Sequence, residues 1–501
     1  MYQTFSLNLF LVLILTKSLL KFRKTNNIST KKPMFKAIFT NSFGILFSRI
    51  LGFIRDLLTA SALGANIYSD IFFIAFKLPN LFRRIFAEGA FTQVFIPAFA
   101  RSRHKAVFSV HIFLVFFSII LLITLLVNLV PSLFTKAIAV GFDEATITLA
   151  SPYVAINFWY LPLIFSVTFL SGMLQYKHHF ATTAFSTALL NLSLIGALLL
   201  SKNQSESEIV TYLSFGVVIG GVLQLFAHLI AIKRLGLLWI LAGGLKHLRL
   251  KSKLIKKETK KFRNNFFPAM WGNSTAQVSA FLDTFLASFL VTGSISYLYY
   301  ANRIFQLPLA LFAIATSIAL FPKVARYLKN GDEKKAKEHL QKAFWFLTFV
   351  LSASTIGGII LSHEITWLLF ERGAFDAQDT TNTTAVLQMY MIGLLPFGIQ
   401  KLFILWLYAK EMQMQAAKIA TLSLGAYIIF ALSFISPFGV AGLALASTLG
   451  GFVSFIFTIK TFGVKNFFDI LRSKNLIYLL VGSVIFTILL LLLKDIISAY
   501  I

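Results

Sequence analysis

Runs of about twenty apolar residues recur along this chain and constrain its fold more than any other feature. A helix needs about 20 such residues to cross the hydrocarbon core of a bilayer. Of the 501 residues, 57% are hydrophobic and only 13% are charged. We therefore predict an all-α, polytopic membrane protein. Its thirteen predicted spans are residues 36–60, 70–98, 107–131, 149–174, 182–201, 209–232, 265–291, 296–322, 343–362, 384–407, 416–435, 438–460 and 475–494.

The charges of the loops support this number of spans. The chain has 46 Lys and Arg residues against 19 acids, and the basic residues gather in every second gap between predicted spans. Because basic loops stay in the cytoplasm, this alternation places the residues near Met34 inside the cell and the C-terminus outside. Nucleic-acid binding would also explain a basic chain, but these residues are dispersed over short loops, so we expect no nucleic-acid partner.

Missing residues and motifs exclude several classes of protein. The chain has no cysteine, which excludes disulfides, thiolate metal sites and a cysteine nucleophile. It also has no H-E-x-x-H motif and no phosphate-binding G-x-x-x-x-G-K-[ST] loop. We therefore expect a transport protein with no catalytic residues, and not an enzyme.

The first 33 residues allow different interpretations. Residues 5–20 form an apolar run that is short for a span, and basic residues follow it, which is the reverse of a signal peptide. This run is either an extra hydrophobic segment or lies upstream of the true start of translation at Met34. We favour Met34, because a basic start there leads directly into the first span.

A long basic loop at residues 233–263 divides the predicted spans into two halves that share short motifs. Asn-Ser occurs at 41–42 and 273–274, FKLP (76–79) matches FQLP (305–308), and IPAFAR (96–101) matches FPKVAR (321–326). Two repeated bundles around a midplane site are a recurrent transporter plan, whereas a single unrepeated bundle predicts no counterparts. We predict two pseudo-symmetric six-helix lobes around a central cationic cavity. The predicted parts are an N-terminal extension (1–33), a first lobe (34–232), the basic loop (233–263), a second lobe (264–461) and a C-terminal helix (462–501).

Charged residues inside the spans are the clearest sign of function. Each costs about 2.5–3.5 kcal/mol at the centre of a span, so it normally faces a bundle interior or a water-filled cavity. Arg49, Gly52 and Asp56 lie at i, i+3 and i+7, along one helix face, with Gly52 as a notch between two charges. Arg49 is roughly 20 Å from the helix start, deeper than a side chain can easily reach from the interface. Arg55 and Asp56 lie nearer the outer end, where a cavity role competes with a plain ion pair or an interface anchor.

The second predicted span carries a proline and a group of charges. Pro79 follows Lys77, precedes Asn80, and should interrupt the helix because it removes a backbone donor.

Arg83 and Arg84 come one turn later, and Glu88 stands at i+4 from Arg84. We predict that Arg84 and Glu88 form a structural pair and that Arg83 is the unpaired cation.

The second half places Arg303 in mid-span near Pro308, and Asp283 in the span before it. Asp283 is the counter-ion of Arg303, a cation or proton site, or a buried acid satisfied by hydrogen bonds. The neighbouring Tyr299 and Tyr300 are more typical of packing or of an interface belt than of a binding site.

Several cavity arginines without matching acids indicate an anionic ligand. A guanidinium group matches phosphate oxygens with two parallel hydrogen bonds, so a pyrophosphate or phosphate head-group is the natural candidate. An exporter of cationic drugs should instead show acids in its cavity.

Four motifs resemble those of a known family. They are SRILGFIRD (48–56), DIFFIAFKLPNLFRRIFAEGAFTQVFIPAFA (70–100), YYANRIFQLP (299–308) and LFERGAF (369–375). They are similar to the motifs of the MurJ (MviN) family of lipid II flippases, in the multidrug/oligosaccharidyl-lipid/polysaccharide exporter superfamily. The resemblance extends from Met34 to about residue 480.

The resemblance implies that two lobes move lipid II, an undecaprenyl-pyrophosphate-linked disaccharide-pentapeptide, to the outer leaflet by alternating access. This step serves peptidoglycan synthesis in the bacterial cytoplasmic membrane. The implied partners are lipid II, membrane lipids and the cell-wall synthesis machinery. The implied cavity residues are Arg49, Arg55, Arg83 and Arg303, and a sodium-site carboxylate of some members would fall at Asp283.

Two features depart from the family pattern. The sequence MQMQA (412–416) stands where members commonly have D-x-K-T-P, so the other sodium ligands are in question. One span follows the second lobe here, where the family usually has two that form a groove for the lipid tail. We expect no cofactor, with Na⁺ or the membrane potential as the driving force. The alternative function is export of another polyprenyl-pyrophosphate-linked glycan.

Overall fold

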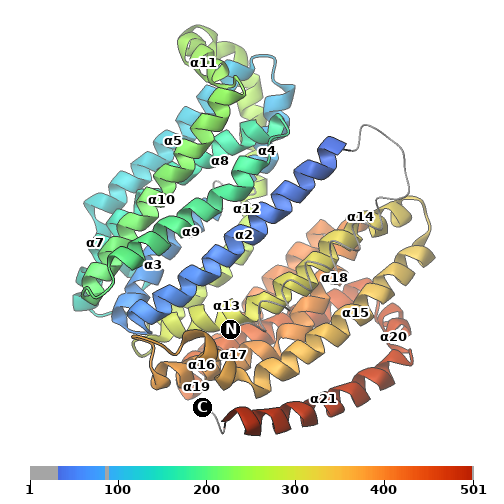
Figure 1. Ribbon diagram of the computed structural model, residues 1–501. Coiled ribbons are helices and arrows are strands. Elements are labelled where there is room, and N and C mark those ends of the chain that lie inside the picture. The colour runs from blue at the N-terminus through green and yellow to red at the C-terminus, as the bar shows by residue number, and fades with distance from the viewer. Residues whose placement is uncertain (1–31, 85–89, 499–501) are drawn as a thin grey trace.

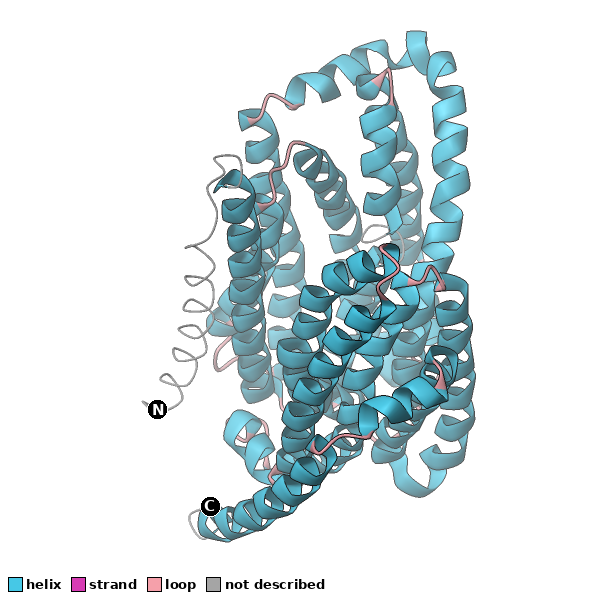
Figure 2. Ribbon diagram, turned by 90° about the vertical axis from the view of Figure 1, so that its right-hand side faces the viewer, coloured by secondary structure: helices cyan, strands magenta, loops and turns pink. Residues whose placement is uncertain are grey.

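The computed structural model describes residues 32–84 and 90–498, and within these ranges it contains helices and no strand (Figures 1 and 2). The apolar run at residues 5–20 and Glu88 lie outside the described residues.

The first lobe contains the helices that precede the long basic connection. They are α2 (Lys32–Leu63), α3 (Ile67–Phe82), α4 (Ala90–Arg101), α5 (Lys105–Leu129), α6 (Pro131–Ile138), α7 (Glu144–Phe158), α8 (Tyr160–Tyr176), α9 (Ala181–Leu200) and α10 (Glu206–Arg234). The connection forms α11 (Leu238–Lys251), η3 (Ser252–Ile255) and the start of α12 (Lys256–Ala287).

Most of α12 belongs to the predicted second lobe (264–461), and two further helices end the chain. The lobe contains α13 (Ser294–Pro308), the π-helical segment η4 (Leu309–Ile314), α14 (Ala315–Lys329), α15 (Glu333–Ile360), α16 (Ser362–Phe370), α17 (Ala377–Ile392), α18 (Leu394–Ala409) and α19 (Gln413–Phe462). The last helices are α20 (Val464–Leu471) and α21 (Asn475–Ser498), and α21 runs beside α15 (Figure 1).

Each predicted span overlaps one to three of these helical elements. By length and apolar composition, eight helical stretches of the described residues can cross a bilayer, and nine if the bent pair α17 and α18 counts as one. The 50-residue α19 contains two predicted spans, because the backbone breaks at Gly439, where φ is 53°. A polytopic membrane protein built only of helices is therefore confirmed for the described ranges.

The helix α12 packs against both lobes. Its first turns place Phe262 and Phe266 among phenylalanines of the first lobe, with the Phe262 and Phe91 ring centres 6.0 Å apart. Glu258 anchors the same end by accepting a 2.6 Å hydrogen bond from Ser102. Toward its other end, α12 lies against α19 in the second lobe. The sequence between the lobes is thus helical and packed on the first lobe, and it is not a free linker.

The lobes meet at one end through a carboxylate that caps a helix. Asp70, near the start of α3, accepts hydrogen bonds from the backbone N–H groups of Gly293 and Ser296 at 2.8 Å each. It also accepts a 2.6 Å bond from the Ser296 hydroxyl. These donors form the N-terminus of α13, where backbone N–H groups lack helical partners and attract a negative charge. A charged residue of the first lobe therefore completes a helix of the second.

A second contact lies beside this cap. The backbone N–H of Ala374, in the loop before α17, donates to the Ser61 carbonyl at 2.8 Å. Asp379 accepts hydrogen bonds from the Ala65 N–H at 2.9 Å and from the Tyr297 hydroxyl at 3.2 Å.

All described hydrogen bonds and ion pairs between the first lobe and the helices from α13 onward involve residues 55–70 of the first lobe. Figure 1 shows the two groups of helices meeting near α13 and separating toward the opposite ends. The loop charges predict that the joined end is the outer one and that the separated end faces the cytoplasm.

The substitution Gly64→Ala should loosen the joined end. Gly64 has a φ of +62°, and a Cβ atom there would lie 2.3 Å from the Ala374 carbonyl oxygen. Strain of about 1–3 kcal/mol should raise the population in which this contact is open by roughly 5- to 150-fold. Since the chain has no cysteine, one thiol introduced at the fully buried Ala60 reports on opening through its labelling by an impermeant maleimide. Gly425→Ala is the control, because no atom lies within 4 Å of a Cβ there. Equal labelling rates in both variants would contradict the account.

Candidate functional site

A buried ion pair lies near the C-terminal end of α2. Arg55 and Asp56 are 8% and 3% exposed, respectively. The Arg55 Nη2 donates to Asp56 Oδ1 at 2.6 Å, and its Nε donates to the same oxygen at 3.1 Å. Neighbouring residues on a helix point about 100° apart, so the long arginine side chain must fold back to reach the carboxylate. Of the open interpretations, the structure shows the ion pair.

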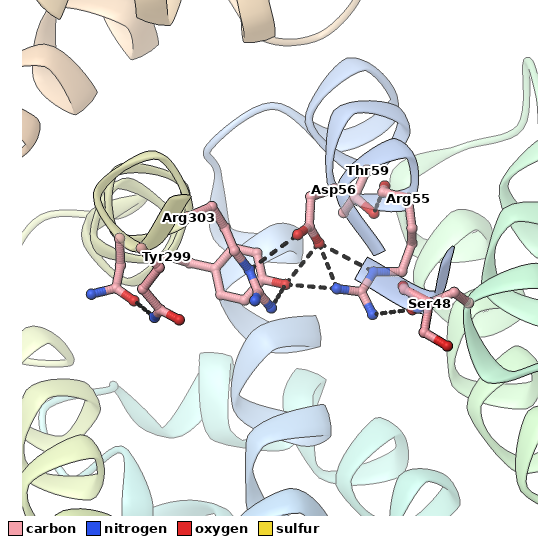
Figure 3. A network of polar contacts seen from close by, with 9 residues as sticks. Ser48, Arg55, Asp56, Thr59, Tyr299 and Arg303 are labelled. Carbon is pink, nitrogen blue, oxygen red and sulfur yellow. Dashed lines mark hydrogen bonds and ion pairs between the residues drawn. The ribbon is translucent and has the colours of Figure 1, made fainter. Parts of the chain in front are cut away.

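Asp56 also pairs with an arginine of the other lobe (Figure 3). The Arg303 Nε, on α13, lies 3.0 Å from Asp56 Oδ2. The Arg303 side chain is 37% exposed, whereas the Asp56 side chain is 4% exposed. One buried carboxylate is thus shared by two guanidinium groups, and this three-residue network carries a net positive charge.

Tyr299 joins the three charged groups. Its hydroxyl donates to Asp56 Oδ1 at 2.8 Å and accepts hydrogen bonds from Arg55 at 3.1 Å and Arg303 at 2.6 Å (Figure 3). Its ring stacks on Phe73 of the first lobe with the centres 3.9 Å apart, and the Arg303 guanidinium lies 4.6 Å from the ring centre. From the sequence, Tyr299 was expected to serve packing or an interface belt and not a binding site. Its position one helical turn before Arg303 was the signal that could have indicated more.

The space beside Gly52 is filled by α9. Asn191 accepts a 3.0 Å hydrogen bond from Arg55 and donates to the Ser48 carbonyl at 2.9 Å. A Cβ on Gly52 would lie 3.3 Å from the Asn191 amide nitrogen. The expectation of a notch between two charges is therefore wrong, because Gly52 gives room to a side chain that holds Arg55. Asn191, a polar residue inside an apolar span, was not predicted.

Arg49 does not join this network within the described residues. Its side chain is exposed, whereas Asp56, seven residues later, is buried. The predicted common helix face therefore does not bring the two side chains together.

The predicted interruption of α3 at Pro79 is wrong. The helix continues through Pro79 to Phe82, and the Asn80 side chain donates to the Phe76 carbonyl at 2.9 Å. Lys77 lies on the same helix and donates to Thr284 of α12.

Arg83 and Arg84 follow α3 in a π-helical turn. Arg84 donates to Gln277 of α12 at 3.5 Å. Its predicted pairing with Glu88 falls outside the described residues, and the division of roles between the two arginines stays a prediction.

Asp283 does not neutralise Arg303, because Asp56 holds that position. Instead, the Asp283 Oδ1 accepts a 2.6 Å hydrogen bond from the hydroxyl of Tyr427, on α19. Among the alternatives, the structure favours an acid that protein groups satisfy.

Comparisons with known proteins agree with this architecture. The family model described as Lipid II flippase MurJ matches residues 59–500. A protein of Helicobacter pylori strain J99, named "Probable lipid II flippase MurJ", is 52% identical over 422 residues, which are 83% of this chain and 92% of that protein.

Solved structures share the fold. One titled "Lipid II flippase MurJ, inward closed conformation" matches with a TM-score of 0.75 at 27% identity, over 91% of this chain and 98% of its own. An inward-facing multidrug resistance MATE family transporter of the MOP superfamily matches with a TM-score of 0.67 over 87% of this chain and 98% of its own. At 12% identity, that second likeness concerns the fold alone.

Removing the shared carboxylate should destabilise the protein strongly. Asp56→Ala leaves Arg55 and Arg303 as buried or half-buried like charges, and breaking such a pair costs about 3–5 kcal/mol. Lys136→Ala is the control, because it breaks an exposed pair with Glu144 and should cost no more than about 1 kcal/mol. The free energy of unfolding in detergent measures both effects. Similar losses in the two variants would count against a shared buried charge.

Proposed function

The chain belongs to the Lipid II flippase MurJ family, and on this premise we propose that Arg303 and its neighbours receive the pyrophosphate of lipid II from the cytoplasmic side. The substrate carries a disaccharide-pentapeptide for peptidoglycan synthesis, and the activity is its transfer to the outer leaflet. Such a transfer breaks no covalent bond, so the chain acts as a transporter and not as an enzyme.

The observation that carries the proposal is the half-exposed guanidinium of Arg303. Its described contacts use Nε and Nη2, whereas an arginine offers five N–H donors. A pyrophosphate group can therefore reach this side chain without first unfolding the site. Arg55, by contrast, is held by Asp56, Asn191 and Tyr299, so its first role is to fix Asp56.

Competition for Arg303 links binding to motion. Phosphate oxygens accept two parallel hydrogen bonds from a guanidinium group, whereas Asp56 contacts Arg303 through the single pair of Oδ2 and Nε. When the pyrophosphate replaces Asp56 on Arg303, one of the contacts between α2 and α13 is lost. Arg49 and Arg83, also on the first two spans, are proposed to hold the remaining anionic charge.

Alternating access requires the outer contacts to open after the substrate binds. We propose that residues 34–232 and 264–461 move as two bodies joined by residues 233–263. The Asp70 cap on α13 and the loop contact at Ala374 would then break, and the separated ends would close.

The proposed location is the bacterial cytoplasmic membrane, with the basic loops inside and the C-terminus outside. Loop charges support this orientation. The site meets lipid II and membrane lipids, and the enzymes that use lipid II outside are its proposed functional partners.

Substitution of the arginines proposed to bind the substrate should abolish complementation of growth. In a strain depleted of its own lipid II flippase, the wild-type gene should restore growth, whereas Arg303→Ala, Arg49→Ala and Arg83→Ala should not. Arg234→Ala is the matched control, since it removes an exposed arginine at the cytoplasmic end of α10. Immunoblots must show equal protein levels. Full complementation by Arg303→Ala would refute the proposed role of Arg303.

Transport should depend on the membrane potential. Moving one negative charge outward across an inside-negative membrane releases about 2.3 kcal/mol per 100 mV. Dissipating the potential with valinomycin and potassium should therefore slow the flipping of lipid II in proteoliposomes. Flipping that continues at the same rate would exclude the potential as the driving force.

A further inference from the structure

A polar cluster connects α3 of the first lobe to α12, away from the shared carboxylate Asp56. Lys77, ten residues from the start of α3, donates to the hydroxyl of Thr284. Asp283, the residue immediately before this acceptor, accepts a 2.6 Å hydrogen bond from the Tyr427 hydroxyl. Thr284 and Tyr427 are 2% and 3% exposed, so the cluster is largely closed to water.

Lys77 and Asp283 carry opposite charges within this cluster, and the described ion pairs include no direct contact between them. The lysine is half-buried, and Asp283 is the acid that attracts it, while Arg84 repels it. In a low-dielectric interior, an acid without a nearby cation would cost several kcal/mol. The ammonium group of Lys77, held by Thr284 next to Asp283, is the cation that attracts this acid.

The same contacts leave few oxygen atoms free to bind a metal cation. A hard cation needs several oxygen ligands, but the Thr284 hydroxyl accepts from Lys77 and Asp283 Oδ1 accepts from Tyr427. Among the described residues, there is no group of three or more His, Cys, Asp or Glu that could hold a metal ion. The residues around Asp283 thus do not fit the sodium site that the family resemblance implies.

We propose that Lys77 is a resident cation which takes the place of a coupling sodium ion at Asp283. A lysine cannot exchange with solvent as an ion does, so it leaves Asp283 only when α3 moves relative to α12. Whether the charge of Asp283 is compensated then depends on the position of α3 relative to α12, and not on the binding of an ion. This part of the proposal, the coupling to lobe motion, rests on the proposed transport function.

Thermal unfolding in different salts tests the resident cation without using substrate. The purified protein is melted in detergent in sodium chloride, potassium chloride and choline chloride at equal ionic strength. The wild-type melting temperature should be the same in all three. In Lys77→Met the melting temperature should fall, and sodium should raise it again by at least about 3 °C over choline, because the vacated site can bind the ion.

Two further variants complete the test. Lys77→Met combined with Asp283→Asn should lose the sodium response and recover part of the stability, since no charge is left to compensate. Lys335→Met is the control, because it removes an exposed lysine at the start of α15 and should behave as the wild type.

Two results would overturn the proposal. The first is a saturable, sodium-specific rise of the wild-type melting temperature that Asp283→Asn abolishes, and this result needs no Lys77 variant to fold. The second is a Lys77→Met protein that melts like the wild type in every salt. Neither outcome involves lipid II, so failure here leaves the transport function untouched, and a failed growth test leaves the resident cation untouched.

Discussion

One buried carboxylate determines how the two lobes approach each other. Asp56 pairs with Arg55 on its own helix and with Arg303 on the opposite lobe, and Tyr299 contacts all three. In the hydrocarbon region a lone charge is costly, so neither arginine can withdraw without another anion. In the proposed mechanism, the network keeps α2 and α13 together until an anionic group competes for Arg303. A lipid with a pyrophosphate head-group has the required charge and geometry.

The remaining contacts at the joined end of the lobes are weaker and also have to open. Asp70 completes the N-terminus of α13, and the loop before α17 contacts the end of α2 through its backbone. When these contacts open, hydrogen bonds to water replace the hydrogen bonds within the protein. Each contact therefore contributes only a modest net free energy. Several modest contacts suit a joint that must open once in every cycle. A large apolar interface at the same place would resist opening.

The sequence predicted the helices well and the polar partnerships less well. Long apolar runs determine where spans lie, because a bilayer demands them, and the predicted ranges overlap the helices. Arg55, Asp56 and Arg303 were predicted as important, but their mutual contact depends on how distant helices pack. Asn191 was missed for the same reason, and Gly52 was misread because its neighbour comes from α9. The rule that a proline interrupts a helix failed at Pro79, because α3 continues through it to Phe82. The side chain of the next residue, Asn80, donates a hydrogen bond to the Phe76 carbonyl in the preceding turn.

The central claim is that Asp56 and the pyrophosphate compete for Arg303. The affinity for lipid II tests this claim most directly. Binding of lipid II to the purified protein would be measured for the wild type, Asp56→Asn and Arg303→Ala. Asp56→Asn frees Arg303 from its counter-charge and should bind at least as tightly as the wild type, whereas Arg303→Ala should bind at least about tenfold more weakly, a difference of 1.4 kcal/mol. Weaker binding by Asp56→Asn together with unchanged binding by Arg303→Ala would contradict the account.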